Sequence, residues 1–223
     1  MDFAKAFDKV PHKRLLSKLN YYGIEYNTLK WIEDCLTSHT VIIDGVQSEK
    51  IHVTSGIPQG TVLDPIMFLV YINDINEYIK HSTLRLFADD SIIYKTIRNK
   101  EDTQKLQEDL TSVAKWEKDW LMSFHPDKCS VLQVTTKLNP IQFDYSLHQH
   151  VLQKETSTKY LGVTTQTDLK WYKHVNNITA SATQKLNFIK RNLRVNSKTV
   201  KERAYVTFYF ILHNILSGGL FSI

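Results

Sequence analysis

Two adjacent acidic residues, Asp89 and Asp90, separate two short apolar runs near the middle of the chain. The runs at 84–87 and 91–94 have the length and apolar character of paired β-strands. Like charges on paired strands repel each other unless the turn is solvated or a cation neutralises them. The sequence therefore predicts a β-hairpin with two carboxylates at its tip. This tip is either a solvated turn, where Asp is common, or part of a metal site.

Helical and strand-like patterns are interleaved along the rest of the chain, which predicts an α+β fold. The longest helical pattern, at 101–124, carries a stripe of aliphatic and aromatic side chains that we expect in the core. The predicted helices are 12–22, a segment capped by Asn27, 67–79, 101–124, 174–193 and 198–216. Further hairpins or strands are predicted at 41–45 with a turn at Asp44-Gly45, at 130–134 and at 159–163.

Positive charge is concentrated toward the C-terminus. The net charge is +5, but from Lys170 onward nine lysines and arginines accompany a single acid, Glu202, so the preceding part is mildly acidic. This asymmetry suits a carboxylate-lined metal site followed by a segment that binds phosphate groups. A basic helix that is merely solvated explains the same charge, and composition alone does not separate the two interpretations.

Cysteine usage and hydropathy argue against several classes of protein. Cys35 and Cys129 have no spacing typical of a disulfide framework or a zinc site. The apolar run at 205–216 is interrupted by His213 and Asn214 and is too short to span a bilayer. No N-terminal segment resembles a signal peptide, so we expect an intracellular protein without a membrane partner.

A third acid, Asp2, opens a short segment that ends at His12. Enzymes that transfer phosphoryl groups with two metal ions need carboxylates that face each other from separate strands. Asp2 and the pair at 89–90 can supply such a set. Their spacing in the sequence does not by itself show that they meet.

Five segments, in order along the chain, resemble the motifs of one enzyme family. They are 2–12, 54–63, 87–90, 125–129 and 159–163. With intervening stretches such as 71–75, the resemblance covers about residues 1–203. It is a resemblance to the reverse transcriptases of non-LTR (LINE-type) retrotransposons, with jockey-like elements as the nearest group. Group II intron reverse transcriptases share the plan but match less well.

The resemblance implies a reverse-transcriptase palm at 1–168, in which an antiparallel sheet with a catalytic hairpin packs on helices. A basic helical start of a thumb would follow at 169–223. The implied activity is that of an RNA-directed DNA polymerase, which transfers a nucleotide onto a primer 3′-hydroxyl with two Mg²⁺ ions, or Mn²⁺ in their place. The implied partners are an RNA template, a DNA primer and deoxynucleoside triphosphates. The implied location is the nucleus or a cytoplasmic ribonucleoprotein.

The resemblance also assigns roles to individual residues. The expected site consists of Asp2, Asp89, Asp90 and Lys128 for catalysis, with the three acids as metal ligands; Phe7, Gly56, Gln59 and Gly60 for nucleotide binding; and Tyr160, Leu161 and Gly162 as the primer grip. Lys128 would donate a proton to the departing pyrophosphate, and Phe7 would exclude a ribose 2′-hydroxyl. Plain core packing of Phe7 and a surface position for Lys128 are the alternatives.

The sequence departs from the family pattern in several places. The fingers domain is missing, the stretch around 38–41 is a few residues short, and 208–223 lacks the usual motif, so we expect a truncated copy with little polymerase activity alone. Asp64 stands where the family usually has glycine, and it either caps the following helix or disturbs a tight turn near the nucleotide. His125 replaces a customary asparagine.

Two other functions are compatible with parts of the sequence. A non-catalytic remnant would keep only nucleic-acid binding by the basic segment, and substitution of Asp89 and Asp90 would leave that binding intact. A small metal-dependent nuclease would use the same acids, but Gln59 and the primer grip would then have no role.

Overall fold

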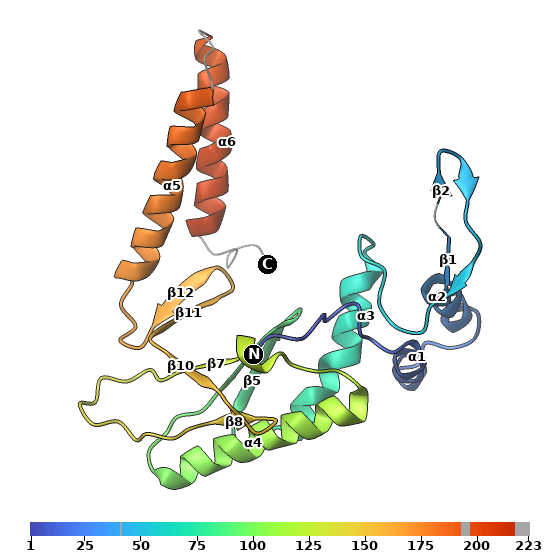
Figure 1. The fold of residues 1–223 in the computed structure, drawn as a ribbon, viewed down its shortest axis with the longest axis horizontal. Helices are drawn as coiled ribbons and strands as arrows, with labels where there is room; N and C mark the ends of the chain where they lie inside the picture. The colour runs from blue at the N-terminus through green and yellow to red at the C-terminus, as the bar shows by residue number, and fades with distance from the viewer. Residues whose placement is uncertain (41, 193–196, 217–223) are drawn as a thin grey trace. The chain divides into compact units, whose positions relative to one another are not determined.

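The computed structural model of the chain describes residues 1–40, 42–192 and 197–216. The chain forms two compact units (Figure 1). The first comprises Met1–Ser130 and Ile141–Gln153, and the second comprises Val131–Pro140 and the chain from Lys154 onward. This division does not follow the predicted boundary between 168 and 169, because the hairpin that precedes the boundary groups with the terminal helices. The assignment of palm and thumb stays a prediction.

Helices form much of the first unit. They are α1 (His12–Tyr21), α2 (Tyr26–Thr37), α3 (Leu63–Ile72), the 3₁₀ helix η1 (Asn73–Tyr78) and α4 (Lys100–Trp120). The helix predicted at 67–79 begins earlier, at Leu63, and continues beyond Ile72 only as the 3₁₀ helix. The predicted cap at Asn27 is wrong, because α2 already includes Tyr26.

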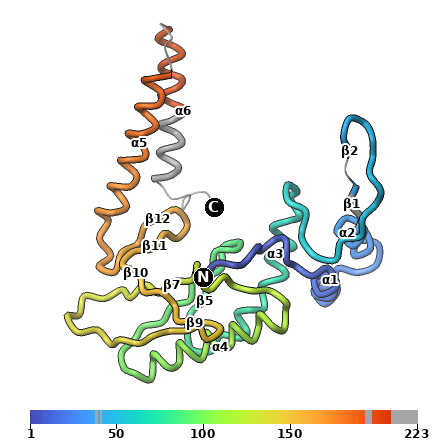
Figure 2. Tube along the Cα trace, viewed as in Figure 1, coloured from blue at the N-terminus to red at the C-terminus, as the bar shows by residue number. Residues whose placement is uncertain are grey.

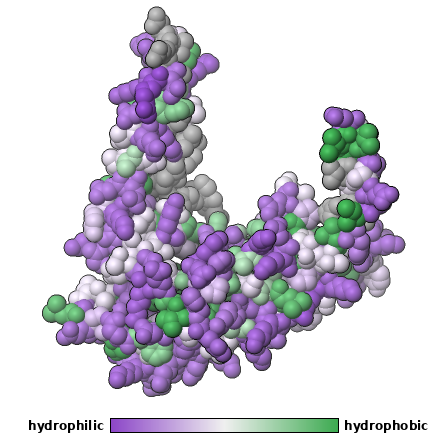
Figure 3. Space-filling model, in the orientation of Figure 1, coloured by the Kyte–Doolittle hydropathy of each residue, from purple (hydrophilic) through white to green (hydrophobic). Residues whose placement is uncertain are grey.

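Short antiparallel pairs complete the first unit. The pairs are β1 (Ser38–His39) with β4 (Ile51–His52), β2 (Ile42–Ile43) with β3 (Val46–Gln47), β5 (Thr83–Phe87) with β6 (Asp90–Tyr94), and β8 (Ser146–Leu147) with β9 (His150–Val151). The predicted turn at Asp44-Gly45 is confirmed: both residues have positive φ, 51° and 80°, as a two-residue hairpin turn requires. Val41, in the same prediction, lies outside the described residues. Figure 3 shows apolar surface on this hairpin, where Ile42, Ile43 and Val46 are exposed.

Helix α4 begins with a reciprocal cap and ends earlier than predicted. The Asn99 side chain accepts a hydrogen bond from the backbone of Asp102, and the Asp102 carboxylate accepts one from the backbone of Asn99. Leu121 adopts a left-handed conformation, with φ of 55°, and this ends the helix after Trp120. The expectation of a helix to Phe124 is therefore wrong. Residues 122–124 are free to pair with another segment.

The core of the first unit lies where α1, α3, η1 and α4 meet. Its largest fully buried side chains include Trp116, Tyr71 and Phe68. A charged pair lies beside them: the Lys18 Nζ is 2.6 Å from the Asp74 Oδ1 and 3.5 Å from the centre of the Trp120 ring. Burial lowers the pKa of Lys18, and the hydrogen bond to Asp74 opposes this shift. This pair joins α1 to η1 and α4.

The second unit contains two strand pairs and two long helices; the first pair begins with Ser130 and Gln153, which belong to the first unit. Strand β7 (Ser130–Leu132) pairs with β10 (Gln153–Glu155), and β11 (Ser157–Tyr160) pairs with β12 (Val163–Gln166). The helices are α5 (Tyr172–Asn192) and α6 (Lys198–Leu216). These elements confirm the predicted strand near 130, the predicted turn near 160 and both closing helices. Leu193 and residues 217–223 of the tail that lacks the usual motif (208–223) lie outside the described residues.

Mixed helices and small antiparallel sheets confirm the α+β fold class at this level. Within the described ranges, none of the helices combines the length and the apolar character that crossing a membrane requires.

Candidate active site

The N-terminal segment brings Asp2 opposite Asp90. The two residues form an antiparallel bridge next to the β5–β6 hairpin. Around the bridge, the Met1 amino group donates to the Ser91 carbonyl oxygen at 2.6 Å, and the Ser91 N–H donates to the Met1 carbonyl oxygen at 3.2 Å. Residues directly opposite each other in an antiparallel pair present their side chains on one face. Two acids far apart in the sequence are therefore neighbours.

The other edge of the N-terminal segment is held by the stretch that follows α4. The His125 N–H donates to the Asp2 carbonyl oxygen at 2.9 Å, and the Ala4 N–H donates to the Ser123 carbonyl oxygen at 2.8 Å. Buried Phe3 stacks on Phe124 with ring centroids 4.1 Å apart. Figure 2 shows the blue N-terminal segment entering beside the green β5. Asp2 thus lies on a strand that is fixed on both edges.

Asp89 lies in the hairpin turn, between Phe87 and Asp90, which are paired. Ala88, the first turn residue, has φ of 50°, a left-handed conformation that costs a residue with a Cβ atom about 1 kcal/mol. Among the residues that the structure describes, no three His, Cys, Asp or Glu side chains lie close enough together to hold a metal ion. The structure therefore brings Asp2 and Asp90 together, but it does not gather all three predicted ligands into one cluster.

Lys128 extends toward these acids. It ends a short 3₁₀ helix, η2 (Pro126–Lys128), and its Nζ lies 3.2 Å from the Asp2 Oδ2. Both side chains are partly exposed, so a substrate can reach them. Lys128 also occupies a surface position, with a side chain that is 61% exposed, so the alternative of a plain surface lysine stays open. Its expected role as a proton donor stays a prediction.

The segment that contains Gly56 and Gln59 packs against the N-terminal segment. The Gly56 N–H donates to the Val10 carbonyl oxygen at 2.9 Å, and the Ile57 N–H donates to the Phe7 carbonyl oxygen at 2.8 Å. The half-buried Phe7 ring stacks on Phe68 of α3 with centroids 4.6 Å apart. The segments at 2–12 and 54–63, which the sequence analysis singled out, therefore pack against each other.

The two glycines of this segment differ in their surroundings. At Gly56, with φ of 101°, an added Cβ atom would lie 3.2 Å from the Asp8 carbonyl oxygen. At Gly60, with φ of 112°, an added Cβ atom would meet nothing within 4 Å. The approach that requires Gly56 is thus one of backbone to backbone within the protein. Only Gly60, next to exposed Gln59, leaves open space for a ligand.

Asp64 has a local structural role. Its carboxylate accepts hydrogen bonds from both the backbone N–H and the hydroxyl of Thr61, and the Thr61 hydroxyl accepts one from the Leu63 N–H at 3.2 Å. The residue is buried. The expectation that Asp64 caps the helix is wrong, because Asp64 lies inside α3 and Val62 is the N-cap residue; the carboxylate instead holds Thr61 in the turn that leads into α3.

The predicted primer-grip residues lie in the second unit. Tyr160 ends β11, and Leu161 and Gly162 form the turn to β12 with φ of 47° and 83°. Leu161 and Gly162 thus form the tip of this hairpin. Its role stays a prediction.

Two buried groups beside the site were missed from the sequence. The Glu117 carboxylate accepts a hydrogen bond from the Phe124 N–H and lies 2.7 Å from the His148 Nε2. Burial raises the pKa of Glu117, while these two partners lower it. Burial also raises the pKa of the Cys129 thiol, so this cysteine is not a thiolate nucleophile. A buried acid in the last turn of a helix with an exposed polar face gives no distinguishing sequence signal.

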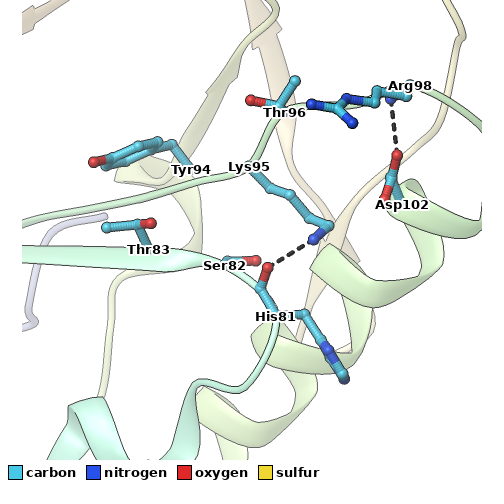
Figure 4. A pocket seen from close by; sticks show the side chains of 8 residues that line it. All are labelled: His81, Ser82, Thr83, Tyr94, Lys95, Thr96, Arg98 and Asp102. Atoms are coloured by element: carbon cyan, nitrogen blue, oxygen red, sulfur yellow. Dashed lines mark hydrogen bonds between the residues drawn. The ribbon is translucent and has the colours of Figure 1, made fainter.

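A separate pocket of about 350 Å³ opens at the other end of the β5–β6 hairpin (Figure 4). Lys95 on its wall donates to the His81 carbonyl oxygen at 2.7 Å, and the Arg98 N–H donates to the Asp102 carboxylate at 2.9 Å. None of the predicted site residues lines it. The polar groups of this pocket mostly bond other groups of the protein. The acidic end of the β5–β6 hairpin is therefore the stronger candidate site.

Comparison with known proteins shows which family the chain is similar to. The family model described as "Reverse transcriptase (RNA-dependent DNA polymerase)" matches residues 1–165. The probable RNA-directed DNA polymerase from transposon BS of Drosophila melanogaster is 29% identical over 201 residues, which are 83% of this chain and 22% of that protein. The RNA-directed DNA polymerase from mobile element jockey of the same species is 28% identical over 188 residues, 80% of this chain and 20% of that protein. The chain therefore spans about a fifth of the length of these relatives.

Proposed function

This chain belongs to the reverse transcriptase family and resembles the enzymes of non-LTR retrotransposons, and from that premise we propose that it forms the catalytic palm of an RNA-directed DNA polymerase. One observation carries the proposal: Asp2 and Asp90 face each other across neighbouring strands, with Lys128 on Asp2. Opposed carboxylates are the feature that nucleotidyl transfer with two metal ions requires.

The donor set fits Mg²⁺. Carboxylate oxygens are the ligands that this hard cation prefers, and Mn²⁺ accepts them as well. Asp2, Asp90 and the neighbouring Asp89 would hold the ions, and without a cation two like charges would face each other on paired strands. When bound, such ions neutralise phosphate charge and favour ionisation of the attacking hydroxyl.

The chain's own residues then divide the remaining tasks. Lys128 would give a proton to the departing pyrophosphate, since its ammonium group already lies at the acids. Phe7 would present an apolar ring edge that offers no partner to a ribose 2′-hydroxyl, because its face is already stacked on Phe68. Exposed Gln59 and open Gly60 would receive the deoxynucleoside triphosphate.

The second unit would bind the template–primer. Helices α5 and α6 carry most of the basic residues that follow Lys170, and Figure 3 shows largely hydrophilic surface along α5. Contacts of lysine and arginine with phosphates are independent of base sequence and weaken as salt rises. The turn at Tyr160–Gly162 would position the primer 3′ end, and the palm and thumb would follow the predicted boundary at 168/169.

Primer extension on an RNA template with Mg²⁺ tests the proposal. We expect Asp90→Asn and Asp89→Asn to lower the rate by at least about 100-fold, the size typical of losing a group that stabilises charge in the transition state. Asp34→Asn, an exposed acid on α2, is the matched control and should leave the rate unchanged.

Binding of an RNA–DNA hybrid, measured in parallel, distinguishes the alternatives. Binding that persists in all variants, together with no extension by any of them, would replace the polymerase proposal with that of a non-catalytic nucleic-acid-binding remnant. Cleavage of the hybrid that depends on Asp90, without extension, would indicate a metal-dependent nuclease.

A further inference from the structure

We propose that His12 is a positioning residue, which fixes the loop that carries Gln59 onto the segment that carries Asp2. The inference rests on the proposed function, because it concerns the alignment of the nucleotide-contacting loop with the metal-binding acid. His12 itself touches neither substrate nor metal in this assignment. It acts through the backbone of Gly56.

The geometry of the ring defines the interaction. The His12 Nε2 lies 2.6 Å from the Gly56 carbonyl oxygen, and the residue is 2% exposed. A carbonyl oxygen only accepts hydrogen bonds, so the proton of a neutral ring must lie on Nε2. The Nδ1 atom is buried and has no hydrogen-bond partner among the described residues. The environment therefore selects one tautomer and uses it for a single bond.

Backbone contacts bring the two segments together but leave the Gly56 carbonyl to the histidine. Pro11 and Ser55 form an antiparallel bridge, and the His12 N–H donates to the Thr54 carbonyl oxygen at 3.1 Å. The Gly56 N–H is taken by Val10. The His12 ring thus supplies a donor for the one polar group of Gly56 that the strand-like contacts do not satisfy.

The Asp8 backbone approaches Gly56 closely. The Asp8 carbonyl oxygen lies 3.2 Å from the place where a Cβ atom would be. Gly56 is therefore bonded through its carbonyl oxygen to the His12 ring, and its α-carbon lies too close to the Asp8 backbone to carry a side chain. Because Gln59 follows only three residues later, a shift of Gly56 would move the proposed nucleotide contact relative to Asp2.

Three variants of the 223-residue chain separate positioning from packing. His12→Leu keeps an apolar side chain but removes the donor. His12→Gln places an amide N–H₂ near the position of Nε2 and should restore the bond. Leu19→Ala, at a 2% exposed position of the same helix α1, lowers stability without removing any hydrogen bond between the segments.

Two measurements are made on each variant. In primer extension, His12→Leu should raise the KM for the deoxynucleotide by about 10- to 100-fold with a smaller change in kcat, since misplacement by about 1 Å has effects of this size. In hydrogen exchange, His12→Leu should lower the protection of the Gly56 and Ile57 amides relative to the amide of Val113 in α4. His12→Gln should resemble the unmodified chain in both, and Leu19→Ala should change neither KM nor the relative protection.

Other results would contradict either the positioning role of His12 or the proposed polymerase function on which it rests. Equal KM shifts in His12→Leu and Leu19→Ala would show that His12 only packs, and failure of His12→Gln to restore either quantity would show that the hydrogen bond is not the cause. If the unmodified chain does not extend primers at all, the proposed function fails, and the exchange data alone then decide whether His12 fixes the loop.

Discussion

The two units of the molecule use charged side chains in opposite ways. In the first unit, several charged groups are buried, and three of them, Lys18, Asp109 and Glu117, bond residues outside their own helix. In the second unit, the buried residues among those described are Gln166, His174 and Ile178, and most of the lysines of α5 and α6 are exposed. Buried charges fix geometry, whereas exposed charges are available to a ligand.

The difference teaches how the proposed tasks are divided. A site that aligns acids within a fraction of an ångström needs groups that have only one satisfactory position. A surface that follows the phosphates of any sequence needs charge without a fixed partner. The contrast can be tested by changing charges of the same chemical type in the two units.

The largest effect is expected from Lys18→Met. The change leaves the Asp74 carboxylate in the core with Trp116 as its remaining side-chain partner, and it should lower the free energy of unfolding by about 3–5 kcal/mol. Lys30→Met, an exposed lysine on α2, should change it by less than about 0.5 kcal/mol. Urea denaturation measures both. A loss below about 1 kcal/mol for Lys18→Met would contradict the view that buried charge organises the first unit.

A moderate and pH-dependent effect is expected at Glu117. Because burial raises the pKa of this carboxyl, the folded state binds the proton more tightly than the unfolded state does. Its favourable contribution is complete below the ordinary glutamate pKa of 4.5 and is lost as the pH rises through the higher value of the folded state.

Glu117→Gln keeps an acceptor for the Phe124 N–H and cannot ionise. The difference in free energy of unfolding between this variant and the unmodified chain should therefore move in favour of the variant as the pH rises from acidic to neutral. Glu117→Ala, which leaves that N–H without its acceptor, should be destabilised by about 1–3 kcal/mol at both. Denaturation at several pH values gives the free energy of unfolding of the unmodified chain and of both variants as a function of pH. A Glu117→Gln difference that does not change with pH would show that the burial of the charge has no energetic consequence.

The smallest effect on stability is expected from the exposed lysines. Lys190→Gln and Lys201→Gln should each leave the free energy of unfolding within about 0.5 kcal/mol of the unmodified chain. Each substitution that removes a phosphate contact should reduce the slope of log affinity for an RNA–DNA hybrid against log salt by about 1. Binding titrations at several salt concentrations, with Lys30→Gln as the control, measure this. An unchanged slope would place the hybrid on another surface.

Local features of the fold were predictable from the sequence, and long-range ones were not. The turn at Asp44-Gly45 follows from residues that tolerate positive φ, and the stripe of α4 follows from the spacing of Leu110, Val113 and Trp116, all of which are buried. The end of α4 was misplaced because Leu121, a good helix former, takes a left-handed conformation that its residue type does not predict.

The same distinction holds for the site. The hairpin with Asp89 and Asp90 was visible in the local pattern, but the neighbour relation of Asp2 and Asp90 rested on a family resemblance. Nothing in the sequence near Lys18 or Asp74 signals their pairing, because a lysine on an amphipathic helix is usually solvated. The bond from His12 to Gly56 was equally hidden, since a lone histidine after proline has no characteristic pattern.

The junction of His12 with Gly56 also closes a loop. The chain between them folds into α1, α2 and the β2–β3 hairpin and returns to the same point. The entropy of closing a loop changes slowly with its length, by about 0.6 kcal/mol for each doubling. Residues can therefore be lost or gained within this loop at little cost to the position of the acids. We expect length variation among related chains to concentrate inside this loop and not in the segments that close it.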